Sequence, residues 1–192
     1  MPVIVGLGNP GAQYARTRHN AGFDAVRRLA DRQRARWDAW KADGRAIAQR
    51  ARVTLAGSEV ILLLPQLFMN LSGEALKAGA IAPGEVLIVC DDVDLPLGAV
   101  RLRPGGGASG HNGLASCLQA LGTQDVARLR LGVGHGGPRP SPLEQFVLEP
   151  FAAQERPAVE EMLEQAASAC EVWVSEGIEA AMNRYNQKVQ DA

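Results

Sequence analysis

Cysteine is scarce in this chain, and its three cysteines share no C-x-x-C spacing. An odd number of cysteines without that spacing argues against a disulfide framework and against a structural zinc site. No apolar run approaches the roughly 18 residues that span a bilayer. The first residues also lack the basic and apolar regions of a signal peptide. Together these absences predict a cytoplasmic protein that does not enter a membrane.

Lysine is almost absent, since 17 of the 20 basic residues are arginine. Genomic base composition is a sufficient explanation of that bias. The formal net charge is −1, but the charges are unevenly distributed along the chain. Residues 101–139 contain five arginines and a single acid, Asp125, whereas residues 154–179 contain seven glutamates and one arginine. The sequence therefore predicts that one side of the molecule suits an anionic ligand.

The length and composition suit one globular domain, with 192 residues of which 46% are apolar and 21% charged. Apolar runs and alternating patterns predict strands at 3–5, 47–55, 60–64, 86–89, 100–103 and 129–133. Helical spacing predicts helices at 20–34, from about 70 or 72 to 80, and at 114–121, 159–173 and 178–185. Because strands and helices interleave, we expect an α/β fold over residues 1–192, a single domain whose twisted, mixed, mostly parallel sheet has helices on both faces.

Three polar or glycine-rich clusters follow predicted strands, at residues 6–9, at residues 91–94 and in the loop after Arg103. In α/β folds, ligands bind at the carboxyl ends of strands. We therefore expect these three clusters to converge on one site.

Residues 6–11, Gly-Leu-Gly-Asn-Pro-Gly, match the G-x-G-x-x-G fingerprint of dinucleotide-binding proteins. That fingerprint needs a helix that opens within the motif, so that its amides face a pyrophosphate. Here Pro10 and a polar run to Arg18 delay the helix, and the nearest acid, Asp31, lies inside it. A tight turn that frees the Asn9 side chain is the better interpretation, with a nicotinamide-dependent oxidoreductase as the alternative function.

Two residues have the positions expected of a general base and its partner. His19 lies in a polar loop before the first helix, and Asp91 directly follows an apolar strand. A histidine with an aspartate partner suits activation of water, although a structural histidine and a turn-capping aspartate are the alternatives. Ser72 and Ser109 are not in a G-x-S-x-G elbow, which argues against a serine hydrolase.

The remaining histidines, His111 and His135, lie beside glycine-rich loops and are weaker candidates. No two histidines have the spacing of metal ligands, and the aspartates at 91–94 have no histidine in their own motif. We therefore expect no metal site.

Three asparagines, Asn9, Asn70 and Asn112, lie at turns beside predicted helix starts. Helix capping is one explanation for them. Their amides can also bind a peptide-like group without adding charge, and Met69 could add an apolar surface.

Five motifs in order resemble bacterial peptidyl-tRNA hydrolases. They are V-G-L-G-N-P-G-x-x-Y-x-x-T-R-H-N-A-G-F at 5–23, F-M-N-L-S-G at 68–73, D-D-x-D-L-P-x-G at 91–98, G-G-G-x-x-G-H-N-G at 105–113 and R-L-R-x-G-x-G at 128–134. The resemblance implies hydrolysis of the ester that joins a peptide to the 3′-terminal ribose of tRNA. It also implies a monomer that binds the acceptor stem and 3′ end of peptidyl-tRNA and needs neither a metal nor a cofactor.

The resemblance also implies a role for each matching residue. His19 would be the general base, and Asp91 would hold and stabilise its imidazole. The residues that would bind substrate are Asn9, Tyr14, Asn20, Met69, Asn70 and Asn112. Arg103 and Arg130 would hold the 5′-phosphate of the acceptor stem, and Arg101 and Arg139 would add contacts to the RNA backbone.

The chain departs from its relatives at several positions. Many relatives have lysine at positions 101, 103 and 139, where this chain has arginine, and arginine can bind a phosphate through two donors. Cys90 replaces a frequent aromatic residue or histidine, and Ala108 and Ser109 alter the glycine loop. RNA binding without cleavage of the ester, by a non-catalytic relative of the same fold, is a third possible function, although the presence of His19 and Asp91 argues against it.

Overall fold

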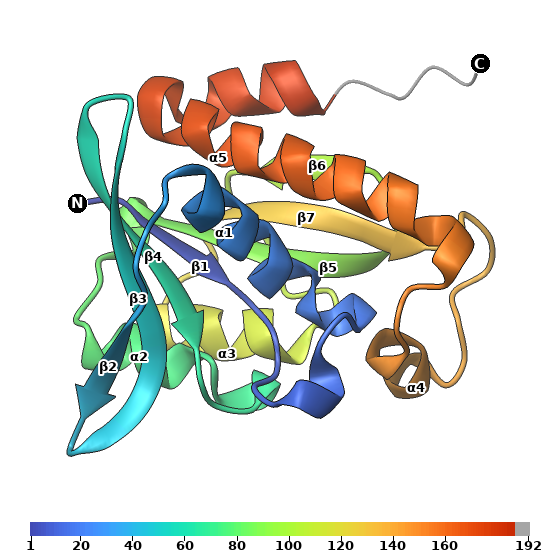
Figure 1. The fold of residues 1–192 in the computed structure, drawn as a ribbon, viewed down its shortest axis with the longest axis horizontal. Coiled ribbons are helices and arrows are strands. Elements are labelled where there is room, and N and C mark those ends of the chain that lie inside the picture. Colours follow the sequence, from blue (N-terminus) through green and yellow to red (C-terminus); the bar gives the residue numbers. More distant parts are fainter. Residues whose placement is uncertain (187–192) are drawn as a thin grey trace.

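The computed structural model describes residues 1–186, which contain one seven-stranded sheet of order β2-β3-β4-β1-β5-β7-β6 (Figure 1). The strands are β1 (Val3–Gly6), β2 (Asp38–Ala42), β3 (Arg45–Leu55), β4 (Ser58–Pro65), β5 (Val86–Pro96), β6 (Val100–Arg103) and β7 (Ala127–Gly134). The α-helices are α1 (Ala21–Arg32), α2 (Gly73–Ala78), α3 (Asn112–Leu121), α4 (Leu143–Leu148) and α5 (Arg156–Tyr185). Short 3₁₀ helices include η1 (Ala12–Tyr14), η2 (Arg18–Asn20) and η3 (Met69–Leu71).

The sheet is mixed, as expected. The four central strands β4, β1, β5 and β7 are parallel to one another, whereas β3 and β2 on one edge and β6 on the other are joined antiparallel. None of the described helices is long and apolar enough to cross a bilayer.

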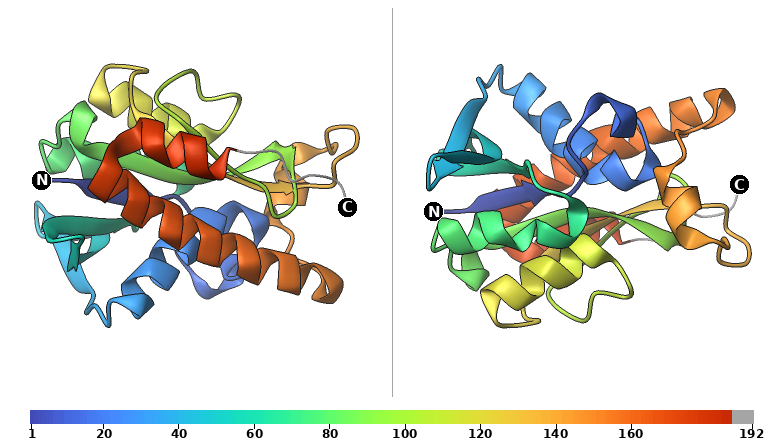
Figure 2. Two further views of the ribbon diagram at one scale, coloured as in Figure 1. Left: turned by 90° about the horizontal axis from the view of Figure 1, so that it is seen from above. Right: turned by 90° about the horizontal axis from the view of Figure 1, so that it is seen from below.

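Helices cover both faces of the sheet, which confirms the predicted class. α1 and α5 lie on one face, and α2 and α3 lie on the other (Figure 2). Successive side chains of β1 alternate between the two layers, so that Ile4 packs with α1 and α5 whereas Val3 and Val5 pack with α2 and α3. Strands buried on both faces need apolar residues at every position, which explains the uninterrupted apolar runs in the sequence.

The strands predicted at 47–55 and 60–64 are β3 and β4, and they form a hairpin. The connecting residues Ala56 and Gly57 have φ angles of 48° and 81°. Two consecutive positive φ angles are typical of a type I′ turn, whose twist matches that of the paired strands.

Other boundaries differ from the sequence prediction. α2 ends at Ala78, so the expectation that Ala80 is helical is wrong: Gly79 ends the helix and Ala80 takes a φ of 47°. The two expected C-terminal helices are both present within α5, where Gly177, with a φ of 86°, interrupts the helical geometry. The sequence did not indicate β2, which is largely exposed, or α4, whose six residues are too few for a helical period.

The glycines of the 6–11 motif allow close packing rather than nucleotide binding. A Cβ atom on Gly6 would lie 2.5 Å from the backbone oxygen of Gly22, and one on Gly22 would lie 2.3 Å from the oxygen of Val89. α1 therefore packs directly onto the ends of β1 and β5. As expected, no helix opens within the motif, because η1 and η2 occupy the polar run before α1. This arrangement argues against the oxidoreductase alternative.

Candidate active site

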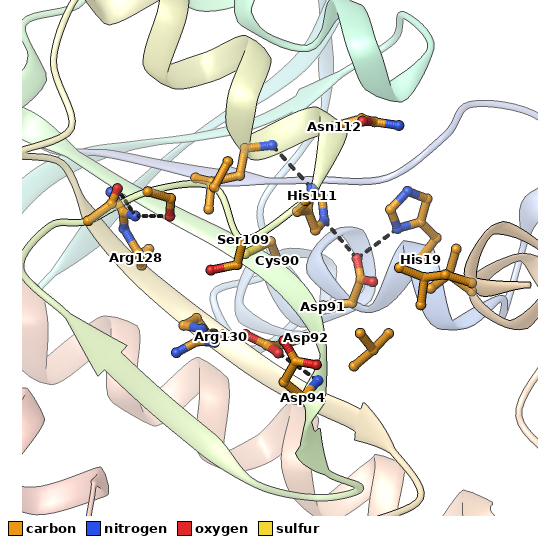
Figure 3. A pocket seen from close by; sticks show the side chains of 18 of the residues that line it. His19, Cys90, Asp91, Asp92, Asp94, Ser109, His111, Asn112, Arg128 and Arg130 are labelled. Carbon is orange, nitrogen blue, oxygen red and sulfur yellow. Dashed lines mark hydrogen bonds and ion pairs between the residues drawn. The ribbon is translucent and has the colours of Figure 1, made fainter. Parts of the chain in front are cut away.

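Asp91 receives hydrogen bonds from two histidines at the end of the buried part of β5. Its Oδ1 atom accepts from His19 Nδ1 and from His111 Nε2, each at 2.9 Å (Figure 3). The Asp91 side chain is 2% exposed, and those of His19 and His111 are 13% and 11% exposed. Since a carboxylate only accepts hydrogen bonds, both of these ring nitrogens carry protons.

The position of His19 follows from the packing of α1. η2 carries His19 and leads directly into α1, whose first turn contacts β1 and β5. With a proton on Nδ1, the neutral ring keeps a lone pair on Nε2. His19 can therefore accept a proton there, which is the chemistry the sequence predicted for it.

His111 is a member of the site that sequence reasoning undervalued. Besides its contact with Asp91, its Nδ1 atom accepts a hydrogen bond from Leu114 N at 3.1 Å and thereby caps α3. His111 stands three residues before the donor Leu114, the spacing of a helix cap, and this was the available sequence signal for its role at the start of α3. Because the two histidines are 92 positions apart in the sequence, their spacing gave no indication that they meet.

Electrostatics favours an ionised Asp91. Burial raises the pKa of this carboxyl group, but the charges and hydrogen bonds of His111 and His19 outweigh burial and hold it well below its ordinary value. Burial lowers the pKa of His111, whereas Asp91 raises it, and the net direction is upward. The site therefore keeps a negative charge between the two imidazoles at neutral pH.

The same three side chains form the group of potential metal ligands found among the described residues, with ligand atoms all within 4.8 Å of one another. Both ring nitrogens point at a single oxygen of Asp91 over hydrogen-bonding distances. A cation at this point would have to replace both ring protons, so the arrangement suits hydrogen bonding better than ligation.

The asparagines meet different environments. Asn9 Oδ1 accepts from Met69 N at 2.9 Å, which joins the turn after β1 to η3. Asn70 and Asn112 are exposed, and no side chain of these three asparagines caps a described helix. The capping explanation is therefore wrong for all three, and His111 caps α3 in place of its neighbour.

The other predicted substrate-binding residues are less accessible or lie further out. Asn20 is 3% exposed, and its amide exchanges hydrogen bonds of 2.8 Å and 3.0 Å with the backbone of Asn9. Met69 is 5% exposed and packs against Gly113 at the start of α3. Tyr14 is partly exposed in η1. Asn20 thus supports the turn that carries the buried Asn9, and Met69 packs between the segments that carry the exposed amides of Asn70 and Asn112.

A cavity of about 330 Å³ lies beside the histidines, on the face of β5 and β7 next to α3. Its lining includes residues 90–94, the glycine loop 105–110, His19, His111 and part of α4. The expected convergence is confirmed for the second and third clusters. The first cluster, residues 6–9, does not line this cavity, and Asn9 joins it to the neighbourhood of the site through hydrogen bonds with Met69 N and with the side chain of Asn20, the neighbour of His19.

The predicted arginines separate into two groups. Arg103, Arg130 and Arg139 line the cavity, as does Arg128, to which the sequence reasoning gave no role. Arg101 does not line it, and its guanidinium donates to the carbonyl of Tyr185 at 3.4 Å. Alternation places four of these arginines on one face of β6 and β7, with leucines on the other, and this was the available sequence signal for Arg101, Arg103, Arg128 and Arg130. Arg139 lies beyond the end of β7.

Arg128 supports the wall of the cavity. It is 2% exposed, and its guanidinium donates to the carbonyls of Gly106, Gly107 and Gln124, the last two at 3.0 Å. The side chain thus fixes the glycine loop, with no carboxylate partner among the described residues.

Arg18 provides similar support beside His19. It is 5% exposed, pairs with Glu155 at 3.0 Å and lies between the rings of Phe146 and Phe151, at 4.6 Å and 4.9 Å from their centroids. No sequence pattern distinguished this arginine from its exposed neighbours.

Known proteins resemble this chain in sequence and in fold. The family model described as peptidyl-tRNA hydrolase matches residues 3–192. A peptidyl-tRNA hydrolase of Nocardia farcinica is 46% identical over 186 residues, covering 95% of this chain and 94% of the relative. One of Desulfitobacterium hafniense is 43% identical over 196 residues, covering 97% of this chain and all of the relative.

Solved structures of peptidyl-tRNA hydrolases are also similar to this chain. The crystal structure of a peptidyl-tRNA hydrolase with N-propanol has a TM-score of 0.87 and 36% identity, covering 100% of this chain and 97% of that one. The enzyme of Acinetobacter baumannii has a TM-score of 0.85 and 36% identity, with 97% and 94% covered. A uridine phosphorylase of Vibrio fischeri, 13% identical with a TM-score of 0.51 over 91% and 92% of the two chains, shares only the fold.

Proposed function

Because this chain belongs to the peptidyl-tRNA hydrolase family, we propose that it hydrolyses the ester between a peptide and the 3′-terminal ribose of tRNA. The observation that carries the proposal is the cluster of His19, Asp91 and His111 beside a cavity lined by arginines. The enzyme is a carboxylic ester hydrolase that returns free tRNA to translation in the cytoplasm. We further propose that residues 1–192 form one domain and act as a monomer, since one chain supplies every group used below.

His19 acts as the general base. Its Nε2 atom takes a proton from water while the water oxygen attacks the carbonyl carbon of the ester. The tetrahedral intermediate then collapses, the bond between that carbon and the ribose oxygen breaks, and the imidazolium returns its proton to the ribose oxygen. The products are a peptide with a free carboxyl group and a tRNA with a free 3′ end, and the scheme uses neither a metal nor a cofactor.

Asp91 stabilises the imidazolium that forms on His19. The carboxylate is buried, so its attraction for the new positive charge is poorly screened by water. His111 is a positioning residue in this scheme, because its hydrogen bond keeps Asp91 Oδ1 directed at His19 Nδ1.

The asparagines bind the peptide and ester end of the substrate. Since Asn9 Oδ1 accepts from Met69 N, the Asn9 amide nitrogen is directed elsewhere. This nitrogen can donate to a substrate carbonyl. The exposed amides of Asn70 and Asn112 add contacts of the same neutral kind.

The cavity binds a phosphate of the acceptor stem. Arg103 is exposed at its wall and forms no ion pair with the residues that the structure describes, so its charge is available to RNA. Arg130 and Arg139 lie further along the same cavity. An acceptor stem bound across the cavity would place its 3′ ester at the general base and its 5′-phosphate at the arginines.

A deacylation assay on N-acetyl-aminoacyl-tRNA beside free aminoacyl-tRNA tests the reaction. The protein should release the N-blocked amino acid, and His19→Ala should slow that release by about 10²–10⁴-fold without abolishing tRNA binding. His135→Ala is the matched control, because this exposed histidine makes no contact with Asp91. A His19→Ala variant that keeps more than about a tenth of the rate at saturating substrate would contradict the mechanism.

A further inference from the structure

The four arginines that line the cavity differ in their partners. Arg103 has no ion pair within the described part of the chain, and Arg128 donates only to carbonyls there. Arg130 instead forms an ion pair with Asp92, and Arg139 lies 3.4 Å from a carboxylate oxygen of Asp94. Two of the four cavity arginines are thus already neutralised by protein carboxylates.

The contact between Arg130 and Asp92 uses the donors that a phosphate would use. Both Nε and Nη2 of Arg130 contact Asp92 Oδ2 (Figure 3). These two atoms form one edge of the guanidinium, the edge that binds carboxylate or phosphate through parallel hydrogen bonds. A phosphate can therefore bind this edge of Arg130 only by competing with the Asp92 carboxylate.

Local structure fixes Asp92 in this position. In the β5–β7 register Cys90 lies opposite Arg130, so Asp92, two residues on, points to the same face of the sheet as both. Asp92 Oδ1 accepts a hydrogen bond from Asp94 N at 2.9 Å, which leaves Oδ2 directed at the guanidinium. The side chains of Arg130 and Asp92 are only 22% and 10% exposed, so solvent screens the pair weakly.

Arg139 is less firmly held. Its side chain and that of Asp94 are 48% and 47% exposed, so water and salt screen their attraction. Competition at Arg130 is therefore the stronger of the two effects.

We propose that Asp92 is a specificity-determining residue that makes Arg130 selective for a terminal phosphate over the phosphates within an RNA strand. A terminal phosphomonoester carries about −1.5 to −2 charges at pH 7, whereas an internal phosphodiester carries one. A monoanionic diester is matched in charge by the carboxylate it has to displace. The more highly charged monoester outcompetes the same carboxylate. This inference rests on the proposed function, because it explains how that site identifies the end of an acceptor stem.

Binding of two RNA hairpins tests the proposal without any chemical step. They have the same acceptor-stem sequence and no amino acid, and they differ only in a 5′-phosphate or a 5′-hydroxyl. Asp92→Asn removes the charge but keeps an oxygen that can accept from Asp94 N. We expect it to bind the 5′-hydroxyl RNA about fivefold more tightly, and the 5′-phosphate RNA with a smaller gain, so that selectivity falls.

Salt dependence provides a second readout of the same change. An arginine released to an internal phosphate adds one counterion-releasing contact, so the slope of log K against log salt for the 5′-hydroxyl RNA should steepen by about 0.9 unit. A purely structural role of Asp92 would weaken binding and would not steepen this slope.

Asp38→Asn is the charge-matched control, because Asp38 is exposed on β2 at the opposite edge of the sheet. Asp92→Ser is the second variant should the asparagine variant fold poorly, since its hydroxyl can also accept from the Asp94 backbone. Unchanged selectivity, or weaker binding of both RNAs by the folded Asp92 variants, would overturn the inference. If the wild type itself ignores the 5′-phosphate, the phosphate site fails too, whereas the deacylation assay judges the ester hydrolysis independently.

Discussion

The two contacts of His111 should be separable by substitution. Asparagine places an oxygen near the position of Nδ1, so His111→Asn keeps the cap on Leu114 N but loses the donor to Asp91. Glutamine places an amide nitrogen near the position of Nε2, so His111→Gln keeps the donor but loses the cap. Each variant thus removes one contact and retains the other.

The magnitudes follow from the burial of Asp91. Its side chain is 2% exposed, so water cannot replace a lost donor, and a hydrogen bond to a charged group contributes about 1.5–3 kcal/mol. His111→Asn should therefore lower the free energy of unfolding by about that amount at pH 7. Loss of a helix cap costs about 1 kcal/mol, which is the expected effect of His111→Gln.

The dependence on pH distinguishes the Asp91 contact from general packing. The pKa of Asp91 is depressed in the folded protein, so the carboxylate contributes stability above its unfolded pKa, at about pH 4, and this stability is lost as pH falls through the folded pKa. His111→Asn raises the folded pKa toward its ordinary value. The stability difference between wild type and His111→Asn should therefore be full between about pH 4 and about pH 6.5, and it should shrink below that range as Asp91 is protonated. It should also shrink above that range, because the pKa of His111 is raised in the folded protein and its contribution is lost as His111 gives up its proton.

Urea unfolding from pH 3 to pH 8 measures these differences, and deacylation rates on the same samples should rank wild type first, His111→Gln second and His111→Asn last. The reasoning would be refuted if His111→Asn cost no more than His111→Gln at pH 7. It would equally be refuted if the deficit of His111→Asn stayed constant through the acid range.

Three further substitutions test other parts of the site. Arg18→Met keeps apolar contact with the neighbouring rings but breaks the ion pair. The free energy of unfolding measured in urea should therefore fall by about 3 kcal/mol, and kcat should fall more than KM rises. A loss under about 1 kcal/mol would show that the ion pair is dispensable. Gly22→Ala drives a methyl group against the Val89 carbonyl, so the free energy of unfolding should fall by about 1–3 kcal/mol and the deacylation rate should fall as well. Unchanged stability and an unchanged rate would show that α1 can move without displacing His19. Arg103→Ala should flatten the slope of log K against log salt for tRNA binding by about 0.9 unit. It should leave the cleavage of a short substrate without a 5′-phosphate unchanged. Equal losses of activity on that substrate and on full-length tRNA would exclude a phosphate contact.

Local patterns were sufficient for most of the fold. Apolar runs identified the strands at the parallel centre of the sheet, because no polar residues interrupt a strand that is buried on both faces. The same patterns failed for β2, an exposed edge strand with a register shift between Trp40 and Lys41. They also failed for α4, which is too short to show a period. Amphipathic periodicity is informative only where an element is long and half buried.

The candidate site was only partly predictable, for a different reason. His19 and Asp91 each stand at a recognisable place, before a helix and after a strand, and their pairing over 2.9 Å confirms the contact expected of them. His111 does not stand out, because its role depends on where the start of α3 lies relative to β5. Arg18 and Arg128 are buried charges whose partners come from distant segments, and no spacing in the sequence encodes such a contact.

The consecutive residues Asp91 and Asp92 show how β5 separates two electrostatic requirements. Two adjacent carboxylates would repel each other if they shared the same partners, but these two, which both line the cavity, make separate contacts. Asp91 is compensated by two imidazole donors and Asp92 by Arg130. A general base needs the first charge close to His19, whereas a phosphate site needs the second charge to remain displaceable. One strand end can meet both needs because each carboxylate has cationic or proton-donating partners of its own.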